Sequence, residues 1–312
     1  MNRKIGIAMH GGAGTILKSQ MNPEKEAMYT DALKEAVLAG EAILLKNGLA
    51  VDAVEAVVRK LEDNPLFNAG KGSVFTHDGK NEMDASIMDG KTLKAGAVTG
   101  VTHVRNPVNL ARAVMDHTEH VFLSGSGAVD FARAMGIPLE TDEYFYVQYR
   151  YDQLKRARES DTIVLDHTAI KDIDEKKFGT VGAVALDVFG NVAAATSTGG
   201  MTNKKHGRIG DSPIIGAGTY ANNKTCAISC TGHGEFFIRS VVAYDISCLM
   251  EYKGLTLKEA CNYVVKDKLK KLGGEGGLIA IDTHGNIEMP FNTEGMYRAS
   301  KHGEDELVTG IY

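Results

Sequence analysis

The sequence predicts an α+β protein in which antiparallel sheets are flanked by helices. Helical periodicity and strand-like runs occupy separate regions of the chain instead of alternating regularly, which favours antiparallel sheets over a doubly wound parallel sheet. The second half also contains paired runs of small and β-branched residues around tight turns, as hairpins do. With 312 residues, 43% of them hydrophobic, the chain is long enough to bury a large core.

The first half of the chain is predicted to begin with a strand and to continue mainly with helices. Residues 5–9 form a short apolar run that ends at the glycine-rich segment 10–14, which predicts a buried strand entering a turn. Helices are predicted where apolar residues recur at helical spacing: 31–46, 52–61, 107–115 and 127–135. Strands are predicted at 83–88 and 95–104, after a loop punctuated by glycines.

The second half begins with a charged segment and then turns to strands. Residues 147–178 are rich in charge and lack apolar periodicity, so we expect an exposed, mobile linker there. Residues 181–186 and 192–197 then form a hairpin, and 277–281 with 287–293 repeat its pattern. We interpret these as two like hairpins of one antiparallel sheet, although convergent turn chemistry also explains the likeness. Between them we expect a long helix over 235–252 and a second helix that begins with a capping box at Thr256 and Glu259.

Composition excludes several classes of partner. The net charge is only −5 and both signs are mixed along the chain, so neither nucleic acid nor a membrane surface is expected, and a small-molecule or dipeptide substrate fits better. No segment reaches the roughly 20 apolar residues of a membrane helix. The four cysteines form no CxxC pair, and the apolar run 5–9 is too short for a secretory signal. We therefore expect buried thiols in a cytoplasmic protein.

Common catalytic motifs are missing, but four glycine-rich stretches carry hydroxyl or charged residues. The sequence has no HExxH, Walker loop, GxSxG or dinucleotide fingerprint. The four stretches are Gly179-Thr180, residues 196–200, residues 207–212 and residues 231–235. Any hydrolytic site must therefore be built from residues outside the familiar motifs, and these four stretches stand out.

In order and spacing, the motifs HGGAG, NPLFNAGKGSVF, FGTVGAVALD, STGGMTNK, GRIGDSPIIGAG and TGHGE resemble the plant-type L-asparaginase and isoaspartyl peptidase family of N-terminal-nucleophile (Ntn) hydrolases. The resemblance covers essentially the whole chain. It implies a single domain, folded as a four-layer αββα sandwich. It also implies a precursor that cleaves itself between Gly179 and Thr180 into an α subunit, 1–179, and a β subunit, 180–312, with the αβ units paired as dimers.

The chemistry of such a cleavage is consistent with a threonine nucleophile. An internal threonine is a poor nucleophile, but cleavage frees the α-amino group of Thr180, whose pKa near ~8 suits a general base. Gly179 lacks a Cβ and so tolerates the strained approach of the hydroxyl. By resemblance, Thr198 hydrogen-bonds the Thr180 hydroxyl, while Thr231 and the Gly232 N–H form an oxyanion hole.

Specificity is expected from the zwitterionic end that L-asparagine and β-aspartyl dipeptides share. Arg208 can bind the α-carboxylate in a bidentate fork, and Asp211 can accept the α-ammonium. Gly234 would let the main chain approach the substrate, and Asn68 resembles a family asparagine near the catalytic centre. No cofactor is expected for the chemistry. The loop 61–71 resembles a sodium-binding loop of the family, which would use these backbone carbonyls: Leu61, Glu62, Asn64, Phe67, Ala69 and Lys71.

Other interpretations of the same residues stay open at this stage. Arg208 and Asp211 could form a surface ion pair, and His233 could be a general base or, as we favour, a structural imidazole. His10 is interpreted as a packing residue, because no nucleophile elbow accompanies it. Two rival functions also remain: a glycosylasparaginase-like amidase, and a binding protein of the same fold that never matures.

Overall fold

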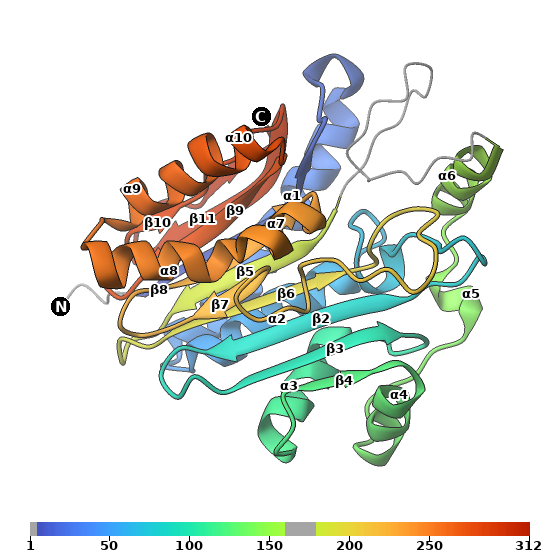
Figure 1. Cartoon of the computed structure of the whole chain (residues 1–312), viewed down its shortest axis with the longest axis horizontal. Coiled ribbons are helices and arrows are strands. Elements are labelled where there is room, and N and C mark those ends of the chain that lie inside the picture. Colours follow the sequence, from blue (N-terminus) through green and yellow to red (C-terminus); the bar gives the residue numbers. More distant parts are fainter. Residues whose placement is uncertain (1–4, 160–178) are drawn as a thin grey trace.

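The computed structural model describes residues 5–159 and 179–312, and the α+β class is confirmed (Figure 1). The first half comprises β1 (Gly6–Gly14), η1 (Lys18–Gln20), α1 (Pro23–Leu45), α2 (Ala50–Glu62), η2 (Gly70–Gly72), β2 (Met83–Asp89), β3 (Ala95–Val101), α3 (Pro107–His117), β4 (Phe122–Ser124), α4 (Gly125–Ala134), α5 (Asp142–Phe145) and α6 (Gln148–Glu159). The second half comprises β5 (Val181–Leu186), β6 (Val192–Thr198), β7 (Thr219–Ala221), β8 (Cys226–Gly232), α7 (Gly234–Ser240), α8 (Val242–Lys253), α9 (Leu257–Asn262), the π-helix η3 (Tyr263–Leu269), α10 (Lys270–Leu272), β9 (Gly276–Asp282), β10 (Ile287–Glu288), β11 (Gly295–His302) and β12 (Val308–Gly310).

Within the described residues the strands form two sheets that lie face to face. The larger sheet has the order β12-β11-β1-β5-β6-β2-β3-β4, and the smaller has the order β10-β9-β8-β7. Neighbouring strands are antiparallel except for β3 and β4, which are parallel. Strands β1, β5 and β6 of the large sheet contact β8 and β9 of the small one. The hairpin β5–β6 therefore lies in the centre of the large sheet and against the small sheet.

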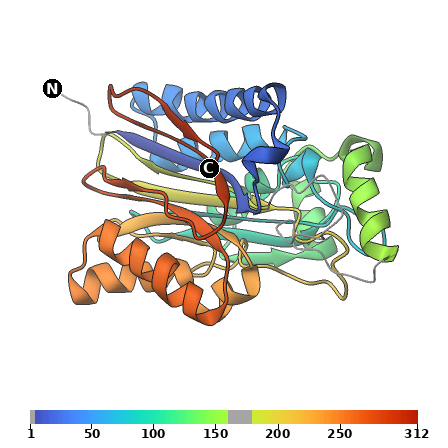
Figure 2. The same ribbon diagram turned by 90° about the horizontal axis from the view of Figure 1, so that it is seen from above.

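Helices cover the outer faces of both sheets. Helices α1, α2 and α3 contact the large sheet, and α8 and α9 contact the small sheet. Figure 2 shows this stacking edge-on, with the blue helices above the strands and the orange helices below them. Among the described residues, no helix is both long and apolar enough to cross a membrane.

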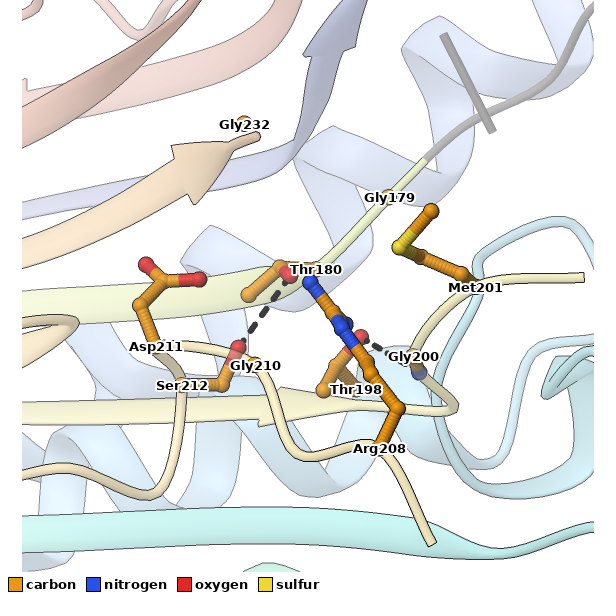
Figure 3. Close-up of a pocket in the computed structure, with 10 residues that line it drawn as sticks. All are labelled: Gly179, Thr180, Thr198, Gly200, Met201, Arg208, Gly210, Asp211, Ser212 and Gly232. Atoms are coloured by element: carbon orange, nitrogen blue, oxygen red, sulfur yellow. Dashed lines mark hydrogen bonds between the residues drawn. The ribbon is translucent and has the colours of Figure 1, made fainter. Parts of the chain in front are cut away.

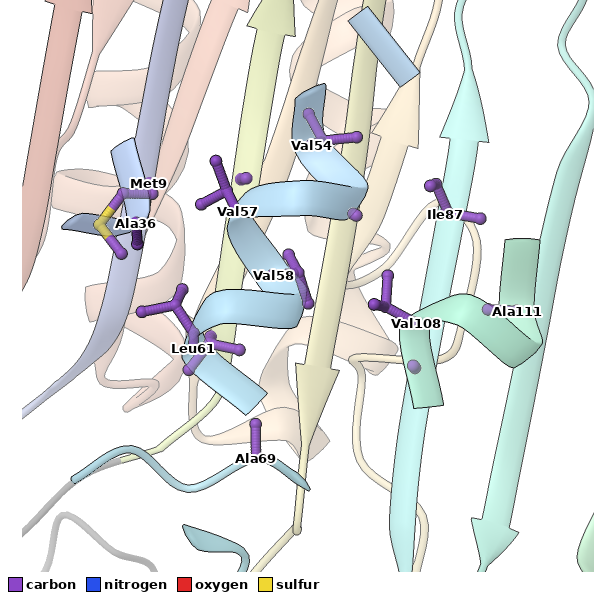
Figure 4. Close-up of a cluster of buried hydrophobic side chains, with 14 of the residues drawn as sticks. Met9, Ala36, Val54, Val57, Val58, Leu61, Ala69, Ile87, Val108 and Ala111 are labelled. Carbon is purple, nitrogen blue, oxygen red and sulfur yellow. The ribbon is translucent and has the colours of Figure 1, made fainter. Parts of the chain in front are cut away.

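The main core lies between α2 and the large sheet (Figure 4). Val54, Val57, Val58 and Leu61 recur at helical spacing on α2, and each is at most 1% exposed. Burying each of these side chains contributes roughly 1.5–3 kcal/mol. The space between the sheets holds a second apolar cluster in which larger side chains are mixed with alanines, among them Ala8, Ala194 and Ala227. Small side chains let the two backbones approach closely, and the catalytic candidates lie in this interlayer.

The helix expected from about residue 31 begins earlier, at Pro23. Asn22 caps it by accepting a hydrogen bond from the Lys25 N–H at 2.8 Å, and Pro23 occupies the first turn. Segment 10–14 was predicted as a turn, but it continues strand β1, with a bulge between His10 and Gly12. This correction matters because the bulge aims Gly12 at the candidate site.

The prediction of an exposed linker over 147–178 is wrong for residues 148–159, which form helix α6. Its anchor is Arg150, which is 1% exposed and donates from Nε to the Gly72 carbonyl at 3.0 Å. Leu154 is also fully buried. The prediction relied on charge density and assumed that charged residues are exposed. Arg150 is instead buried and bonded to a backbone carbonyl, so it packs as part of the core. The remainder of the predicted linker, 160–178, lies outside the described residues.

Two further predictions are corrected. The two like hairpins share a local turn, because Asp187 and Asp282 each accept backbone N–H bonds two and four residues ahead. They nevertheless lie in different sheets, β5–β6 in the large one and β9–β10 in the small one. The long helix expected over 235–252 is broken at Val241, whose φ is 49°. The capping box of Thr256 and Glu259 is confirmed.

Candidate active site

Thr180 immediately precedes β5, a central strand of the large sheet, and is only 6% exposed. Its hydroxyl oxygen is 3.2 Å from the hydroxyl oxygen of Ser212. Its carbonyl oxygen accepts a hydrogen bond from His10 Nδ1 at 3.0 Å. Gly12 packs against Gly179, the residue before Thr180, since a Cβ on Gly12 would lie 2.9 Å from the Gly179 nitrogen. The Gly179-Thr180 junction is therefore enclosed by backbone from β1.

A small pocket opens beside this junction (Figure 3). Its lining combines hydroxyls, two charged side chains and glycines: Gly179, Thr180, Thr198, Gly200, Met201, Arg208, Gly210, Asp211, Ser212 and Gly232. All but Gly179 and Thr180 come from the ends of β6 and β8 and from the loop between β6 and β7. The fold thus brings together most of the residues that the sequence singled out.

Thr198 ends strand β6 and faces this pocket, but its hydroxyl accepts a hydrogen bond from the Gly200 N–H at 3.0 Å. Within the described part of the chain, no hydrogen bond joins the hydroxyls of Thr198 and Thr180, and Ser212 takes that place. A bond between Thr198 and Thr180 in a cleaved form stays a prediction.

Asn68 supports the pocket from behind and does not line it. It is fully buried and donates from Nδ2 to the Gly200 carbonyl at 2.8 Å. Its Oδ1 accepts from the Val74 N–H at 2.9 Å, and its own carbonyl accepts from the Gly199 N–H at 3.0 Å. These bonds fix the turn that follows Thr198.

Gly232 ends strand β8 and lines the pocket, whereas Thr231, fully buried just before it, is not among the lining residues. The Thr231 hydroxyl accepts a hydrogen bond from the Ala13 N–H at 3.3 Å, which leaves its own proton available for donation. Gly232 is paired with Gly276 across the sheet, and a Cβ on Gly232 would lie 2.7 Å from the Gly276 Cα. The backbone N–H of Gly232 is therefore held in one orientation.

Arg208 and Asp211 both line the pocket, but they do not pair with each other in this structure. Arg208 instead donates to Glu235 in a bidentate fork, with Nε–Oε1 and Nη2–Oε2 distances of 2.9 Å. Gly234 lies between the two pocket residues, because a Cβ there would be 2.9 Å from Arg208 Nη2 and 2.9 Å from Asp211 Oδ1. A larger residue at 234 would push the two charged groups apart.

The Asp211 carboxyl is the most unusual polar group of the pocket. Its side chain is buried, and its Oδ2 has no hydrogen-bond partner. Burial raises the pKa of Asp211 to about 7, although Arg208 partly counteracts this. A buried carboxylate oxygen without a partner is costly unless a ligand supplies a donor. Its place in the pocket makes it suited to an ammonium group.

The sodium ligands expected in the loop 61–71 are backbone carbonyl oxygens, and the buried Glu62 carboxyl group of this loop is bonded instead to Ser197 and to the Val108 N–H. The carbonyls of Asn64, Phe67 and Ala69 each accept one backbone N–H and keep a second lone pair, whereas the Leu61 carbonyl accepts from both Asp63 and Asn64. A Cβ on Gly70 would overlap the Glu62 carbonyl oxygen, so the loop is closely wound there. Among the described residues, no cluster of His, Cys, Asp and Glu is suited to a metal ion. Neutral carbonyls fit a singly charged cation better than a divalent one.

Sequence comparison with known proteins points to the same kind of site as the residues that line the pocket. The family model described as "Asparaginase" matches residues 3–311. The chain belongs to the asparaginase family. It is 56% identical over 309 residues to the isoaspartyl peptidase of Escherichia coli (strain K12), covering 99% of this chain and 96% of that protein. It is 44% identical over 314 residues to the plant-type L-asparaginase of Pyrococcus furiosus, covering 98% of this chain and 100% of that protein.

Three residues of this asparaginase-family site escaped sequence reasoning. Ser212 immediately follows Asp211, and Glu235 immediately follows Gly234, so adjacency to candidate residues was the available signal. His10 had been interpreted as packing, yet it bonds the carbonyl of Thr180 from 170 residues away. His233 lies outside the pocket lining, with Nε2 3.5 Å from Glu235 Oε2. This position favours a structural imidazole over a general base.

Proposed function

We propose that this chain is an autoprocessed threonine amidohydrolase that hydrolyses isoaspartyl dipeptides and L-asparagine to release L-aspartate. The observation that carries the proposal is the position of Thr180. It follows Gly179 immediately before strand β5, and its pocket also contains Arg208, Asp211 and Gly232. The family membership and the names of the relatives support the same activity. In this proposal the stacked layers form the αββα sandwich of Ntn hydrolases.

Activation is proposed to begin with an N-to-O acyl shift. The Thr180 hydroxyl attacks the Gly179 carbonyl carbon, the peptide C–N bond breaks, and the Thr180 nitrogen takes the proton. Water then hydrolyses the resulting ester, which yields a carboxylate on Gly179, the free hydroxyl and a free α-amine. Ser212, whose oxygen is 3.2 Å from the attacking oxygen, can hold the hydroxyl in place. The products are an α subunit, 1–179, and a β subunit, 180–312.

Turnover would reuse the same atoms. The α-amine of Thr180 accepts the hydroxyl proton, and the oxygen attacks the side-chain amide carbon of the substrate. The Thr231 hydroxyl and the Gly232 N–H stabilise the oxyanion. The amine then protonates the leaving ammonia or amino acid, and water hydrolyses the β-aspartyl ester to free aspartate. Thr198, at the edge of the pocket, would orient the freed hydroxyl.

Recognition would use the charges around Gly234. The unpartnered Asp211 oxygen accepts the α-ammonium, and the α-carboxylate replaces Glu235 on the Arg208 fork and adopts the same bidentate geometry. Asn68 would act indirectly by bracing the turn at 199–200. We also propose that the carbonyl-lined loop 61–71 holds a structural sodium ion and that two αβ units associate into a dimer.

The test compares the wild type with Thr180→Ser and Thr180→Ala. We expect purified wild type to yield two fragments, one starting Thr-Val-Gly-Ala, and to release aspartate from L-asparagine and β-aspartyl-leucine. The Ser variant, which keeps the hydroxyl, should retain both activities at reduced rates, and the Ala variant should lose both. An intact wild-type chain that binds but never turns over would support the non-maturing binding protein. Preferential hydrolysis of glycosylated asparagine would support the glycosylasparaginase.

A further inference from the structure

His10 lies in the middle of β1, between β5 and β11, and its side chain is fully buried. Its Nδ1 is 3.0 Å from the carbonyl oxygen of Thr180, and its Nε2 is 2.9 Å from the hydroxyl oxygen of Ser229. The mechanism proposed above does not use this side chain. Yet it is the group that holds the backbone of the nucleophile itself.

The two contacts determine which ring nitrogen of His10 carries the proton. A carbonyl oxygen can only accept, so Nδ1 must be protonated to bond Thr180. Burial lowers the pKa of His10 to about 3, with the bond to Thr180 partly opposing that shift, so the ring is neutral near pH 7 and Nε2 has a lone pair. The Ser229 hydroxyl must then donate to Nε2. The geometry thus fixes one tautomer.

Ser229 is the first member of a row of fully buried hydroxyls between the two sheets: Ser229, Thr196, Thr219 and Ser86. Ser229 and Thr196 oxygens are 2.7 Å apart, Thr196 contacts Thr219, and Ser86 and Thr219 oxygens are 2.8 Å apart.

The row ends beside the nucleophile. Ser86 donates to the Ser212 carbonyl at 2.6 Å, and the Ser212 hydroxyl contacts the Thr180 hydroxyl at 3.2 Å. A chain of polar contacts therefore links the Thr180 carbonyl, through His10 and the hydroxyl row, to the backbone carbonyl of Ser212, and the side chain of the same serine contacts the Thr180 hydroxyl.

Gly182 is the residue of β5 that makes room for this chain of contacts. A Cβ at 182 would overlap the Ser229 hydroxyl oxygen and would lie 2.6 Å from His10 Nε2. The neighbouring interlayer is apolar, with Val184 and Ile279 among its members. Apolar residues of similar size would fill the same space without any need for matched hydrogen bonds. The hydroxyl row therefore serves the orientation of Thr180 more than the packing of the interlayer.

We propose that His10 is a positioning residue for Thr180, both in self-cleavage and in turnover, an inference that rests on the proposed function. Its Nδ1–H fixes the carbonyl of Thr180 and hence the backbone torsion that orients the hydroxyl and the amine. Ser229 holds the ring in the orientation that this bond requires. Because misplacing a reacting group by about 1 Å can cost ~100-fold in rate, losing this bond should affect the rate more than substrate binding.

The test uses two amide substitutions that differ in reach. The amide nitrogen of Asn can occupy the position of Nδ1 and bond the Thr180 carbonyl, whereas the amide of Gln reaches the position of Nε2. We expect His10→Asn to cleave itself and to keep kcat within ~10-fold of wild type. His10→Gln should lose ~100-fold in kcat and cleave more slowly, with KM nearly unchanged because Arg208 and Asp211 are untouched.

The proposal is overturned if His10→Asn and His10→Gln have equal kcat, or if kcat simply follows thermal stability. Because both variants could fail to fold, the wild type supplies an independent measurement by ¹⁵N NMR of its histidines. At pH 7 the His10 ring should be protonated at Nδ1 and not at Nε2, and the opposite tautomer or a charged ring would refute the assignment. If the wild type itself neither cleaves nor turns over, the proposed function fails, whereas the tautomer measurement does not depend on activity.

Discussion

Substitution of Gly12 by alanine should slow self-cleavage without preventing folding. Gly12 has φ of 112°, and a Cβ there would lie 2.9 Å from the nitrogen and 3.0 Å from the carbonyl oxygen of Gly179. Restoring ordinary contact requires a shift of about 0.5 Å in Gly179, whose carbonyl belongs to the peptide that we propose is cleaved. If a misplacement of about 1 Å costs ~100-fold, this shift alone predicts a ~10-fold slower cleavage. The positive φ adds roughly 1–3 kcal/mol of strain, which could be relieved by further movement of the same peptide.

Pulse-labelled cell-free synthesis allows cleavage of Gly12→Ala to be followed on a denaturing gel from the time of folding. Gly100→Ala is the matched control, since Gly100 also has a positive φ, 60°, but a Cβ there meets nothing within 4 Å. We expect the control to cleave at the wild-type rate and to lose less thermal stability than Gly12→Ala, because a φ of 60° lies in the left-handed region that non-glycine residues can enter. If Gly12→Ala cleaves as fast as wild type, or if Gly100→Ala is slowed equally, the contact with Gly179 does not set the rate.

Three further predictions concern Gly234, Asp211 and His10. Gly234→Ala should raise KM at least ~10-fold, because its Cβ separates Arg208 from Asp211, while self-cleavage measured on the same gels should be unchanged; impaired cleavage would instead mean a structural role. With the pKa of Asp211 raised to about 7, only the ionised form binds ammonium, so KM should rise ~10-fold per pH unit below 7, and a KM that is flat from pH 7 to 5.5 would contradict this. The pKa of His10 is lowered to about 3 in the folded state, so its contribution to stability is complete above pH 6.5 and is lost as pH falls toward 3. Denaturant unfolding should show that the free energy of unfolding falls between pH 7 and pH 5 by about 2 kcal/mol more in the wild type than in His10→Asn. Equal decreases in the two proteins would disprove this prediction.

Periodicity and turn chemistry predicted helices α1 to α4 and the strands of both hairpins, but not β7, β8, β11 or β12. The hairpin of β5 and β6 and the capping box at Thr256 were found because their signals lie within a few residues of one another. Two of the misses had non-local causes. Helix α6 is anchored by Arg150 on the carbonyl of Gly72, and such a contact between distant residues leaves no local periodicity. The assignment of β9 and β10 to a second sheet likewise depends on pairing with β8.

The sequence motifs predicted which segments form the candidate site, but they did not predict the hydrogen-bond partners of its side chains. The glycine and threonine stretches indicated which segments converge, and Thr180, Arg208 and Asp211 do line one pocket. The partners of these groups could not be predicted, because each pairing is decided by side-chain orientation. Arg208 bonds Glu235, and the Thr180 hydroxyl contacts Ser212, although other acceptors stand equally near in the sequence. The bond from His10 required knowledge that β1 lies beside β5.

Three glycines explain how so many polar groups fit around one threonine. Gly12 leaves room for the Gly179 peptide, Gly182 for the Ser229 hydroxyl, and Gly234 for the charges of Arg208 and Asp211. In each case the missing Cβ is replaced by a polar atom that is aimed at the junction or the pocket. A methyl group at any of the three positions would therefore displace polar groups of the site before it displaced residues of the hydrophobic core. By contrast, a Cβ at Gly190 meets nothing within 4 Å, so substitution of that glycine acts only through backbone strain. This difference distinguishes glycines that make room for groups of the site from glycines that only allow a turn.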